Sequence, residues 1–443
     1  MPRHIHAEIP SMLKRLLTIA VGLIIVAAAG FAILSHRPAI APISPPAASS
    51  FSADEVERGR LATAAGFCVT CHTAPGGKEL AGGLSFKTPF GTLYSTNITP
   101  DPDTGIGRWS EAAFARAMSE GVRRDGKHLF PAFPFDHFTK VSDADVQAIY
   151  AYLMTRPAVH QEAPANTLPF PLNIRAFEWG WKLLSFRPGK FQPDPSKSAE
   201  WNRGAYLAEG LGHCSSCHSP RNLWQAEEQG DQRYNGNIIE GWYAPPLNAS
   251  NPSSIPWTEQ ELYTFLKTGA TALHGSAGGS MGHVTRQLAQ LPDSDVHAIA
   301  TYYADLDGSA QRHVDTQAVI KQALAKSASD TVRPADHGAQ IFRAACASCH
   351  YNGGDEPQLM RPELALTTAL NANNPNDLVM VVLNGVSMPD GLPTAMMPGF
   401  KHALTDKDIA DLANYLRRSR TDKGEWDDLP ARIAELRKLS TEP

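Results

Sequence analysis

The pentapeptide CVTCH at residues 68–72 sets the pattern of the whole chain, because the same Cys-x-x-Cys-His arrangement returns as CSSCH at residues 214–218 and as CASCH at residues 346–350. These three stretches contain all six cysteines of the 443-residue chain. On a helix, positions i, i+3 and i+4 share one face, so two cysteines and the next histidine can meet one porphyrin ring. This spacing is typical of covalent haem attachment. The sequence therefore predicts three covalently bound haem c groups.

Each residue of the motif has an expected role in holding a haem. The cysteines form thioether bonds, and the histidines are the proximal iron ligands. The predicted cofactor-binding residues are Cys68, Cys71, Cys214, Cys217, Cys346 and Cys349, and the predicted proximal ligands are His72, His218 and His350. A zinc site and a thioredoxin-like redox pair are the other interpretations of this spacing. Zinc would need further ligands nearby, and none repeats from one motif to the next.

An uncharged apolar run, LLTIAVGLIIVAAAGFAIL, occupies residues 16–34 and is close to the length that a helix needs to cross a bilayer. Lys14 and Arg15 precede it, so the positive-inside rule keeps residues 1–15 in the cytoplasm and sends the rest across the membrane. The alternative is a cleaved signal peptide, but Pro42 follows the best small-residue site and the run is long for a signal core. We therefore predict a transmembrane anchor at 16–34 and a Pro/Ala/Ser-rich tether at 35–50.

An internal repeat organises most of the remaining chain. Each copy opens with a glycine and a helical run into the motif, continues through a loop to a second helix, and closes on a third helix announced by a cap. Ser110 and Thr258 are the predicted N-caps of the second helix in the first two copies. This order predicts a mainly α protein with haem domains at residues 51–158, 198–308 and 334–421.

Three segments lie outside the repeats. Residues 159–197 form a Pro-rich linker with the aromatic run FEWGWKLLSF, residues 309–333 form a helix-like linker, and residues 422–443 form a C-terminal tail. The aromatic side chains either pack under a haem domain or contact a partner or the bilayer surface. Packing is the favoured interpretation, because exposed aromatic patches are uncommon without a partner.

The repeated helix order resembles the class I cytochrome c domain, here strung three times along one chain. The resemblance implies that the segment between the second and third helices supplies the sixth iron ligand, and a thioether there raises the haem potential relative to a second imidazole. The predicted sixth ligands are His137, Met281 and Met397 in chain order.

Each sixth ligand has competitors. The loop FPAFPFDHF from Phe130 contains no methionine, so His137 is its nearest donor, and the alternatives are an open iron site or a helix residue such as Met118 or Met154. The rivals of Met281 are His274 and His283, and the rivals of Met397 are Met388 and Met396.

The whole chain resembles the triheme cytochrome c subunit of membrane-bound bacterial periplasmic dehydrogenases. The resemblance lies in GGKELAGGLSFKTPFGTLYSTNITPDPDTGIGRWS from Gly76, in FPAFPFDHFTKVSDADVQAIYAYL from Phe130 and in MPGF from Met397. The alcohol and sugar dehydrogenase branch has Pro-Ala-Met-Pro in the first haem loop, where this chain has Phe133 instead of the methionine. This version resembles the branch that works with molybdopterin and iron–sulfur aldehyde or N-heterocycle oxidoreductases.

The resemblance implies an electron-transfer subunit in the bacterial inner membrane, with its haem domains in the periplasm. The expected partners are a molybdopterin aldehyde dehydrogenase subunit, a small iron–sulfur subunit and ubiquinone, and the alternative partner is a quinoprotein alcohol or flavoprotein sugar or gluconate dehydrogenase. No substrate-oxidising site and no catalytic residue is predicted in this chain. The formal net charge of −5 gives no indication of nucleic-acid binding. A haem peroxidase and a soluble electron shuttle are the other functions compatible with these motifs.

Overall fold

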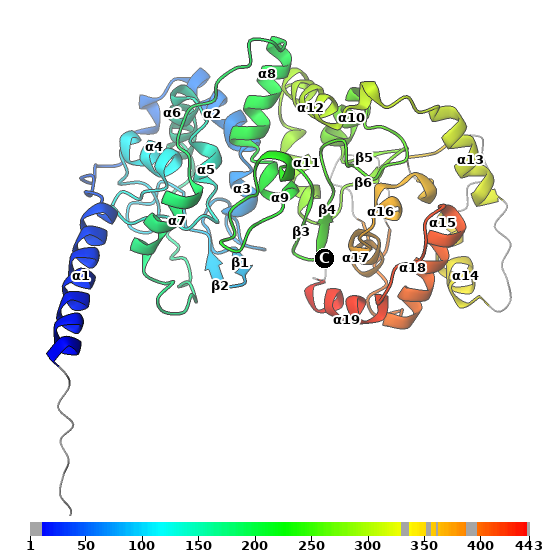
Figure 1. Cartoon of the computed structure of the whole chain (residues 1–443). Helices are drawn as coiled ribbons and strands as arrows, with labels where there is room; N and C mark the ends of the chain where they lie inside the picture. Colours follow the sequence, from blue (N-terminus) through cyan, green and yellow to red (C-terminus); the bar gives the residue numbers. More distant parts are fainter. Residues whose placement is uncertain (1–10, 329–335, 351–355, 360–361, 387–396, 441–443) are drawn as a thin grey trace, which may run out of the picture. The chain divides into compact units, whose positions relative to one another are not determined.

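Helices make up most of the chain in the computed structural model, which describes residues 11–328, 336–350, 356–359, 362–386 and 397–440 (Figure 1). The predicted mainly α class is therefore confirmed. The chain divides into two units, the first formed by Met1–Ser50, His72–Thr139 and Leu153–Gly189, and the second by Phe51–Cys71, Lys140–Tyr152 and Lys190–Pro443. The predicted domain boundaries follow the haem motifs instead, and they stay a prediction.

The first unit combines one long N-terminal helix with short helices and a hairpin. Strands β1 and β2 pair antiparallel, with Phe86 opposite Leu93. The elements are α1 (Ser11–Ser35), η1 (Ala48–Ser50), β1 (Ser85–Thr88), β2 (Gly91–Tyr94), α4 (Glu111–Glu120), α5 (Phe135–Phe138), η2 (Arg175–Phe177) and α7 (Glu178–Ser185).

The second unit contains the helices that carry and close the repeats. Its elements up to the second closing helix are α2 (Ala53–Ala65), α3 (Cys68–Cys71), α6 (Asp143–Met154, of which the last two residues belong to the first unit), α8 (Ala199–Tyr206), η3 (Leu207–Leu211), α9 (Ser215–His218), η4 (Gly230–Gln232), β3 (Asn237–Ile239), β4 (Trp242–Ala244), α10 (Glu259–Thr268), β5 (Ala270–Thr271), β6 (Gly275–Ser276), α11 (Ser280–Leu288) and α12 (Asp293–Asp307). The remaining ones are η5 (Ser309–Gln311), α13 (Thr316–Ala328), α14 (His337–Ile341), η6 (Phe342–Cys346), α15 (Ala347–His350), η7 (Leu364–Leu366), α16 (Thr368–Asn371), α17 (Asn376–Asn384), α18 (Asp406–Arg420) and α19 (Leu429–Leu439).

The apolar run expected to span the membrane is helical. Within α1, residues Arg15–Ser35 are long and apolar enough to cross a bilayer. The expected tether begins at the end of this helix, but its first residues are fixed to the folded unit. Ile40 N–H donates to the Arg124 carbonyl at 2.8 Å, and Arg116 donates to the Pro38 carbonyl at 2.7 Å. The end of α1 is therefore held against the folded part rather than spaced away from it.

One glycine crossing recurs in all three repeats of the second unit. The helix that leads into each motif crosses the closing helix at the glycine that opens the repeat. A Cβ added to Gly59, Gly204 or Gly338 would overlap a main-chain carbonyl oxygen, that of Ala148, Ala298 and Asp411 respectively. Two helices can approach this closely only where neither has a side chain in the way. The glycines therefore fix the angle at which each motif helix meets its closing helix.

A polar contact accompanies each glycine crossing. The residue before the glycine contacts an acidic residue in the first turn of the closing helix. Arg58–Asp145 and Arg203–Asp295 are ion pairs at 2.8 Å, and in the third copy His337 lies 3.6 Å from Asp408. The cap expected before each closing helix is present in the first and third copies, where Ser142 and Thr405 accept the N–H groups of Asp145 and Asp408. In the second copy this expectation is wrong, because α12 follows Pro292, which provides no side-chain cap. The repeats thus share local chemistry as well as helix order.

The predicted N-caps of the second helices are confirmed. Ser110 accepts the Ala113 N–H and Thr258 accepts the Glu261 N–H, each at 3.2 Å. Both helices end at a glycine in the left-handed region, Gly121 with φ of 62° and Gly269 with φ of 83°.

The segments expected as a linker and a tail contribute to the core of the second unit. Ile320 and Leu324 of α13 pack with Ile255 and Leu366. Leu429, Ile433 and Leu436 of α19 join the core formed by α14, α17 and α18. Each of these three is 4% exposed or less, so α19 is an integral part of the third repeat rather than an appendage.

We expect Gly338→Ala to lower the free energy of unfolding of the third repeat by about 1–3 kcal/mol, because the added methyl group forces α14 away from the Asp411 carbonyl. Guanidinium unfolding followed by far-UV circular dichroism measures this loss. Gly424→Ala is the matched control, since no heavy atom lies within 4 Å of its added Cβ. Equal unfolding midpoints for the two variants would contradict the role of the crossing.

Candidate haem sites

None of the six motif cysteines is paired in a disulfide. Burial raises the pKa to about 12 for Cys68 and Cys214, and to about 11 for Cys71, Cys217 and Cys346. A thioredoxin-like redox pair would need a thiol with a lowered pKa. These surroundings instead suit a sulfur atom that carries no charge, as in a thioether.

The first two motif histidines are oriented in the same way by the loop that follows them. His72 Nδ1 lies 2.6 Å from the Thr96 carbonyl oxygen, and His218 Nδ1 lies 2.7 Å from the Pro245 carbonyl oxygen. A glycine N–H in each loop also donates to the histidine carbonyl, from Gly82 at 2.7 Å and from Gly236 at 2.8 Å. A carbonyl partner at Nδ1 places the proton there and leaves Nε2 with its lone pair for iron.

Burial lowers the pKa of His72, His218 and His350, so each is neutral near pH 7, as iron ligation requires. At His350 the backbone of Pro362 favours the protonated ring, as Thr96 and Pro245 do in the other motifs.

The residues just before the first two motifs touch each other. Phe67 and His213 precede Cys68 and Cys214, and both have a positive φ, of 52° and 35°. Their rings meet edge to face with centroids 5.5 Å apart. Cys71 and Cys217 are also close enough for electrostatic repulsion to add to the raised pKa of Cys71. The first two cysteine pairs of the second unit therefore lie side by side.

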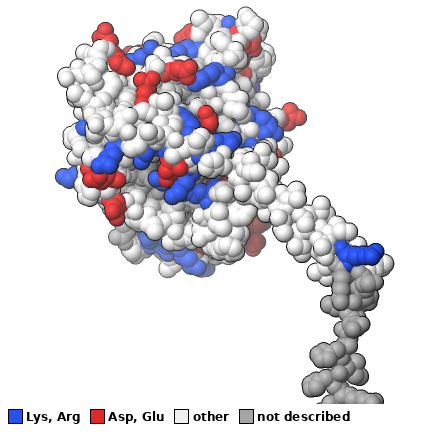
Figure 2. Space-filling model, turned by 90° about the vertical axis from the view of Figure 1, so that its left-hand side faces the viewer, with Lys and Arg blue, Asp and Glu red and all other residues white. Residues whose placement is uncertain are grey.

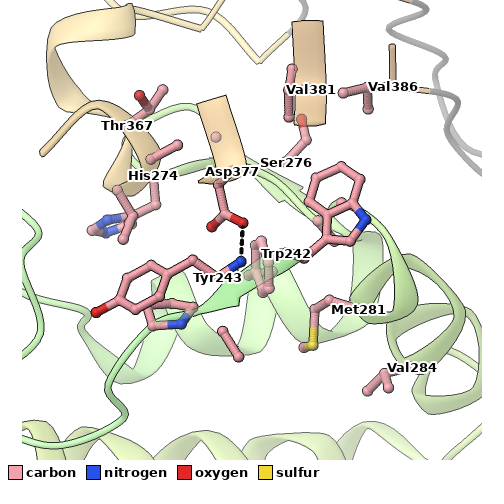
Figure 3. Close-up of a pocket in the computed structure, with 18 of the residues that line it drawn as sticks. Trp242, Tyr243, His274, Ser276, Met281, Val284, Thr367, Asp377, Val381 and Val386 are labelled. Atoms are coloured by element: carbon pink, nitrogen blue, oxygen red, sulfur yellow. Dashed lines mark hydrogen bonds between the residues drawn. The ribbon is translucent and has the colours of Figure 1, made fainter. Parts of the chain in front are cut away.

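The second and third motifs open into one cavity of about 580 Å³ (Figure 3). Its lining is mostly apolar and includes both cysteines and the histidine of each of these two motifs. Met281 of α11 and Met397, the two predicted sixth ligands of these repeats, also line it. His274 lines the cavity as well, whereas His283 is not among its lining residues. Met388 and Met396 lie outside the described residues.

His137, the candidate ligand of the first repeat, is held in a buried position. It lies in α5 and is 3% exposed. The ring of its neighbour Phe135 fills the space that a Cβ on Gly121 would need, which fixes α5 against the end of α4. Phe133, at the position where the alcohol and sugar branch has methionine, packs its ring on Phe138, with ring centroids 5.3 Å apart. His137 is therefore not a surface histidine.

The cavity contains a polar group that suits a haem carboxylate. His274 is 5% exposed and stacks on Trp257 with ring centroids 3.7 Å apart. Its Nδ1 lies 3.4 Å from Ser253 Oγ, but none of the described residues forms a hydrogen bond with its Nε2. A buried nitrogen without a partner costs free energy unless a bound group satisfies it. Apolar walls, motif cysteines and this nitrogen together fit a covalently attached haem.

Hydrogen bonds join the second repeat to the third along one wall of the cavity. The Asp377 carboxylate accepts the Tyr243 N–H at 2.8 Å (Figure 3). Asn376 donates to the Gly241 carbonyl at 2.8 Å. Burial raises the pKa of Asp377 to about 7, although the Tyr243 N–H acts in the opposite direction. These bonds connect the β3–β4 hairpin to the start of α17. No sequence pattern indicates them, because they join residues more than 130 positions apart.

A buried acidic network supports the second motif, and it too was not predicted from the sequence. Glu209 lies in η3, five residues before Cys214, and is 7% exposed. Tyr234 and Tyr302 donate to it at 2.9 and 2.6 Å, Lys140 pairs with it at 2.9 Å, and Arg233 pairs with it as well. Burial alone would raise the pKa of Glu209, but Arg233 and Lys140 outweigh it and hold the pKa at about 2. The only sequence feature that could have indicated this network is that Glu209 is a single acidic residue within the apolar run LAEGLG.

Helices in this order around Cys-x-x-Cys-His motifs define a c-type cytochrome with covalently bound haem. The cytochrome c family model matches residues 56–157 and 335–420. A fructose dehydrogenase cytochrome subunit from Gluconobacter japonicus is 36% identical over 392 residues, which cover 84% of this chain and 80% of the relative. A gluconate 2-dehydrogenase cytochrome c subunit from Pantoea cypripedii is 36% identical over 407 residues, with 87% and 90% covered. The chain belongs to this family of cytochrome c subunits of dehydrogenases.

Another relative is a longer protein. A nicotinate dehydrogenase subunit from Pseudomonas putida is 50% identical over 409 residues, which cover 91% of this chain but 34% of the relative. The chain thus spans about a third of the length of that relative.

We expect Met281→His to lower the midpoint potential of one haem, because a second imidazole stabilises ferric iron relative to a thioether. Axial ligands change haem potentials over a range of roughly 0.8 V, so the exchange of one ligand should lower the midpoint potential by a measurable part of that range. A spectroelectrochemical titration of the purified protein measures it.

His283→Ala is the matched control for Met281, since His283 lies two positions away in α11 but does not line the cavity. All haem potentials should be unchanged in this variant. If a haem midpoint potential shifts in His283→Ala but not in Met281→His, the result would contradict Met281 as the sixth ligand and favour His283.

Glu209→Gln should remove about 3 kcal/mol of stability at pH 7, the equivalent of a pKa lowered from 4.5 to about 2. Because the folded-state pKa is the lower one, this stability is present above pH 4.5 and is lost as the pH falls toward 2. Denaturant unfolding at several pH values should show a smaller loss of stability on acidification in the variant than in the unmodified protein. Exposed Glu435→Gln serves as the control, and an equal acid dependence of Glu209→Gln and the unmodified protein would contradict the role of the network.

Proposed function

We propose that this chain binds three haem c groups and conducts electrons as the cytochrome subunit of a dehydrogenase complex. The proposed attachments are the six motif cysteines, and the proposed axial pairs are His72 with His137, His218 with Met281, and His350 with Met397. The observation that carries the proposal is the single cavity shared by the second and third motifs. Two cofactors held in one cavity lie within a short distance of each other, as electron transfer requires.

The protein's own residues hold, orient and insulate the cofactors. Haem, when bound, supplies reversible one-electron oxidation and reduction. Thr96 and Pro245 fix the rings of His72 and His218 through their Nδ1 atoms. The apolar lining excludes water, and the hydrogen bonds from Tyr243 and Asn376 keep the second and third sites at a constant separation. The contact between the Phe67 and His213 rings keeps the first and second motifs at a constant separation.

The proposed location is the bacterial inner membrane, with α1 as an uncleaved anchor and the haem domains in the periplasm. The anchor is supported by the length and composition of Arg15–Ser35 and by Lys14 and Arg15 before the apolar run. It is also supported by the hydrogen bond of 2.8 Å between His128 Nε2 and the Ser35 carbonyl, which ties the end of α1 to the folded unit.

We propose a molybdopterin dehydrogenase with a small iron–sulfur subunit as the electron donor and ubiquinone as the acceptor. Phe133 replaces the methionine expected of the alcohol and sugar branch, and identity to the nicotinate dehydrogenase relative is 50%, against 36% for the fructose and gluconate relatives. Aldehydes are the substrates that the sequence resemblance favours. N-heterocycles are the second candidate class, and the nicotinate relative supports them.

The test is to purify the complex from detergent-solubilised membranes through a tag on this chain and to determine its metals and organic cofactors. Haem is expected at three per chain, together with molybdenum and iron–sulfur iron. An aldehyde or an N-heterocycle should then reduce the haems in the purified complex. Pyrroloquinoline quinone or flavin without molybdenum would overturn the molybdopterin partner in favour of the alcohol or sugar branch. Haem without any partner subunit would overturn the dehydrogenase complex itself.

A further inference from the structure

A set of large apolar side chains lies exposed around α7 in the first unit. The exposed fractions are 79% for Phe170, 40% for Leu172, 40% for Ile174, 46% for Phe177, 57% for Leu183 and 65% for Leu184. These six residues, here called the α7 face, belong to one segment of 15 residues. Exposed apolar patches of this kind mark contacts with a partner or a membrane.

The opposite side of α7 is fixed to the folded unit, so the α7 face cannot turn inward. Trp181 and Phe186 pack edge to face on the ring of Phe135, with centroids 5.9 and 5.2 Å apart. Lys182 donates to the carbonyls of Glu120 and Gly121 at 2.7 and 2.8 Å. Its Nζ also lies 2.9 Å from His128 Nδ1. The exposure of Leu183 and Leu184 is therefore a stable property of the fold.

Ring contacts place the same segment against the anchor helix. Phe31 of α1 lies 5.4 Å from Phe177 and 5.6 Å from Trp179, measured between ring centroids. Four residues later, the Ser35 carbonyl is held by His128, which also contacts Lys182 of α7. Figure 1 shows α7 beside the end of α1 that enters the folded unit.

The length of α1 fixes the depth of these contacts in a bilayer. The 21 residues Arg15–Ser35 span ~31 Å at 1.5 Å per residue, which matches a hydrocarbon core of ~30 Å. Phe31 precedes Ser35 by four residues, or ~6 Å, and so lies within the outer leaflet when Arg15 is at the cytoplasmic surface. Side chains in contact with Phe31 must then lie at the boundary between lipid tails and headgroups. Tryptophan side chains such as Trp179 are enriched at this level.

The charged groups around α7 are compatible with this position. Arg187 is exposed and donates to the carbonyls of Leu183 and Leu184 at the end of α7, where its guanidinium can also meet lipid phosphates. Burial raises the pKa of Glu178 to about 7, so the one carboxyl group of α7 is partly protonated at neutral pH. Figure 2 shows α1 as a rod without charged residues until the basic group near its far end.

We propose that the α7 face is a second membrane contact, which lies in the outer-leaflet interface beside α1 and fixes the orientation of the first unit on the bilayer. The inference rests on the proposed role of α1 as an uncleaved anchor. The occupant is the lipid of the leaflet that α1 crosses, because the face is continuous with the surface of that helix. A second contact point prevents the folded unit from rotating freely about a single anchor, and so presents one side of it to the membrane.

The test uses the full-length, haem-loaded protein in lipid nanodiscs. Since haem attachment consumes all six natural cysteines, Leu184→Cys provides a single thiol for an environment-sensitive fluorophore. Leu223→Cys is the matched control, because Leu223 is 89% exposed and does not belong to the α7 face. Lipids that carry a spin-label quencher near the headgroup should quench the fluorophore severalfold more at position 184 than at position 223.

Equal quenching at the two positions would overturn the inference. The inference would also be overturned if neither position is quenched and the fluorophore at position 184 is shielded from solvent only when the dehydrogenase subunit is added. That result would identify the dehydrogenase subunit as the occupant of the α7 face. Intact-mass analysis of the same sample reports separately on the anchor. If α1 is retained but position 184 is not quenched, the result contradicts the lipid contact of the α7 face and leaves the anchor intact. If α1 is lost, the result contradicts the proposed anchor. Quenching at position 184 then still decides whether the α7 face binds lipid.

Discussion

The crossing of two helices at a glycine is the constraint on which each haem site depends. At Gly59, Gly204 and Gly338 the backbone of the motif helix lies directly on a carbonyl of the closing helix. In each copy the residue before the glycine, an arginine or a histidine, contacts an aspartate of the closing helix. The motif begins a few residues beyond this crossing, so the positions of its cysteines and histidine follow from the helix angle. A haem site of this type is therefore specified by two segments about 70 to 100 residues apart, and neither can form it alone.

In the proposed electron path, contacts between repeats hold the second and third sites together. The Tyr243–Asp377 and Asn376–Gly241 hydrogen bonds make a wall common to the second and third sites. Trp242 lies in the same wall and fits against Gly278 and Gly279, where a Cβ would overlap its ring. Such contacts restrict the movement of one repeat against the next, and a constant separation between cofactors is what a conducting subunit must maintain. The polar groups of the wall are thus structural, in contrast to His274, whose Nε2 needs a bound partner.

The sequence predicted whatever is encoded locally. The motifs, the opening glycines, the N-caps Ser110 and Thr258 and the membrane-length helix could all be recognised from spacing and residue type. What it could not predict depends on long-range packing. Residues 309–333 and 422–443 carry too little periodic signal to show that α13 and α19 complete the core of the second unit. Glu209 is an isolated acid in the sequence, and only the fold brings Lys140, Arg233 and two tyrosines to it. Packing was the favoured prediction for the aromatic side chains of residues 159–197. Trp181 and Phe186 do pack on Phe135, whereas Phe177 is 46% exposed.

The variable part of the repeat is the loop before the closing helix. The glycine crossing is retained in all three copies, and a side-chain cap is present in the first and third. The proposed donor in that loop, in contrast, changes from His137 to Met281 and Met397. Since a thioether favours ferrous iron and an imidazole favours ferric iron, the proposed ligands place the lowest potential at the first site. The first site is also the one whose loop is fixed by Gly121 and Phe135, beside the Lys182 and His128 contacts that lead to the end of α1. A constant scaffold with a variable ligand loop thus allows the potential of each site to differ while the separation between sites stays the same.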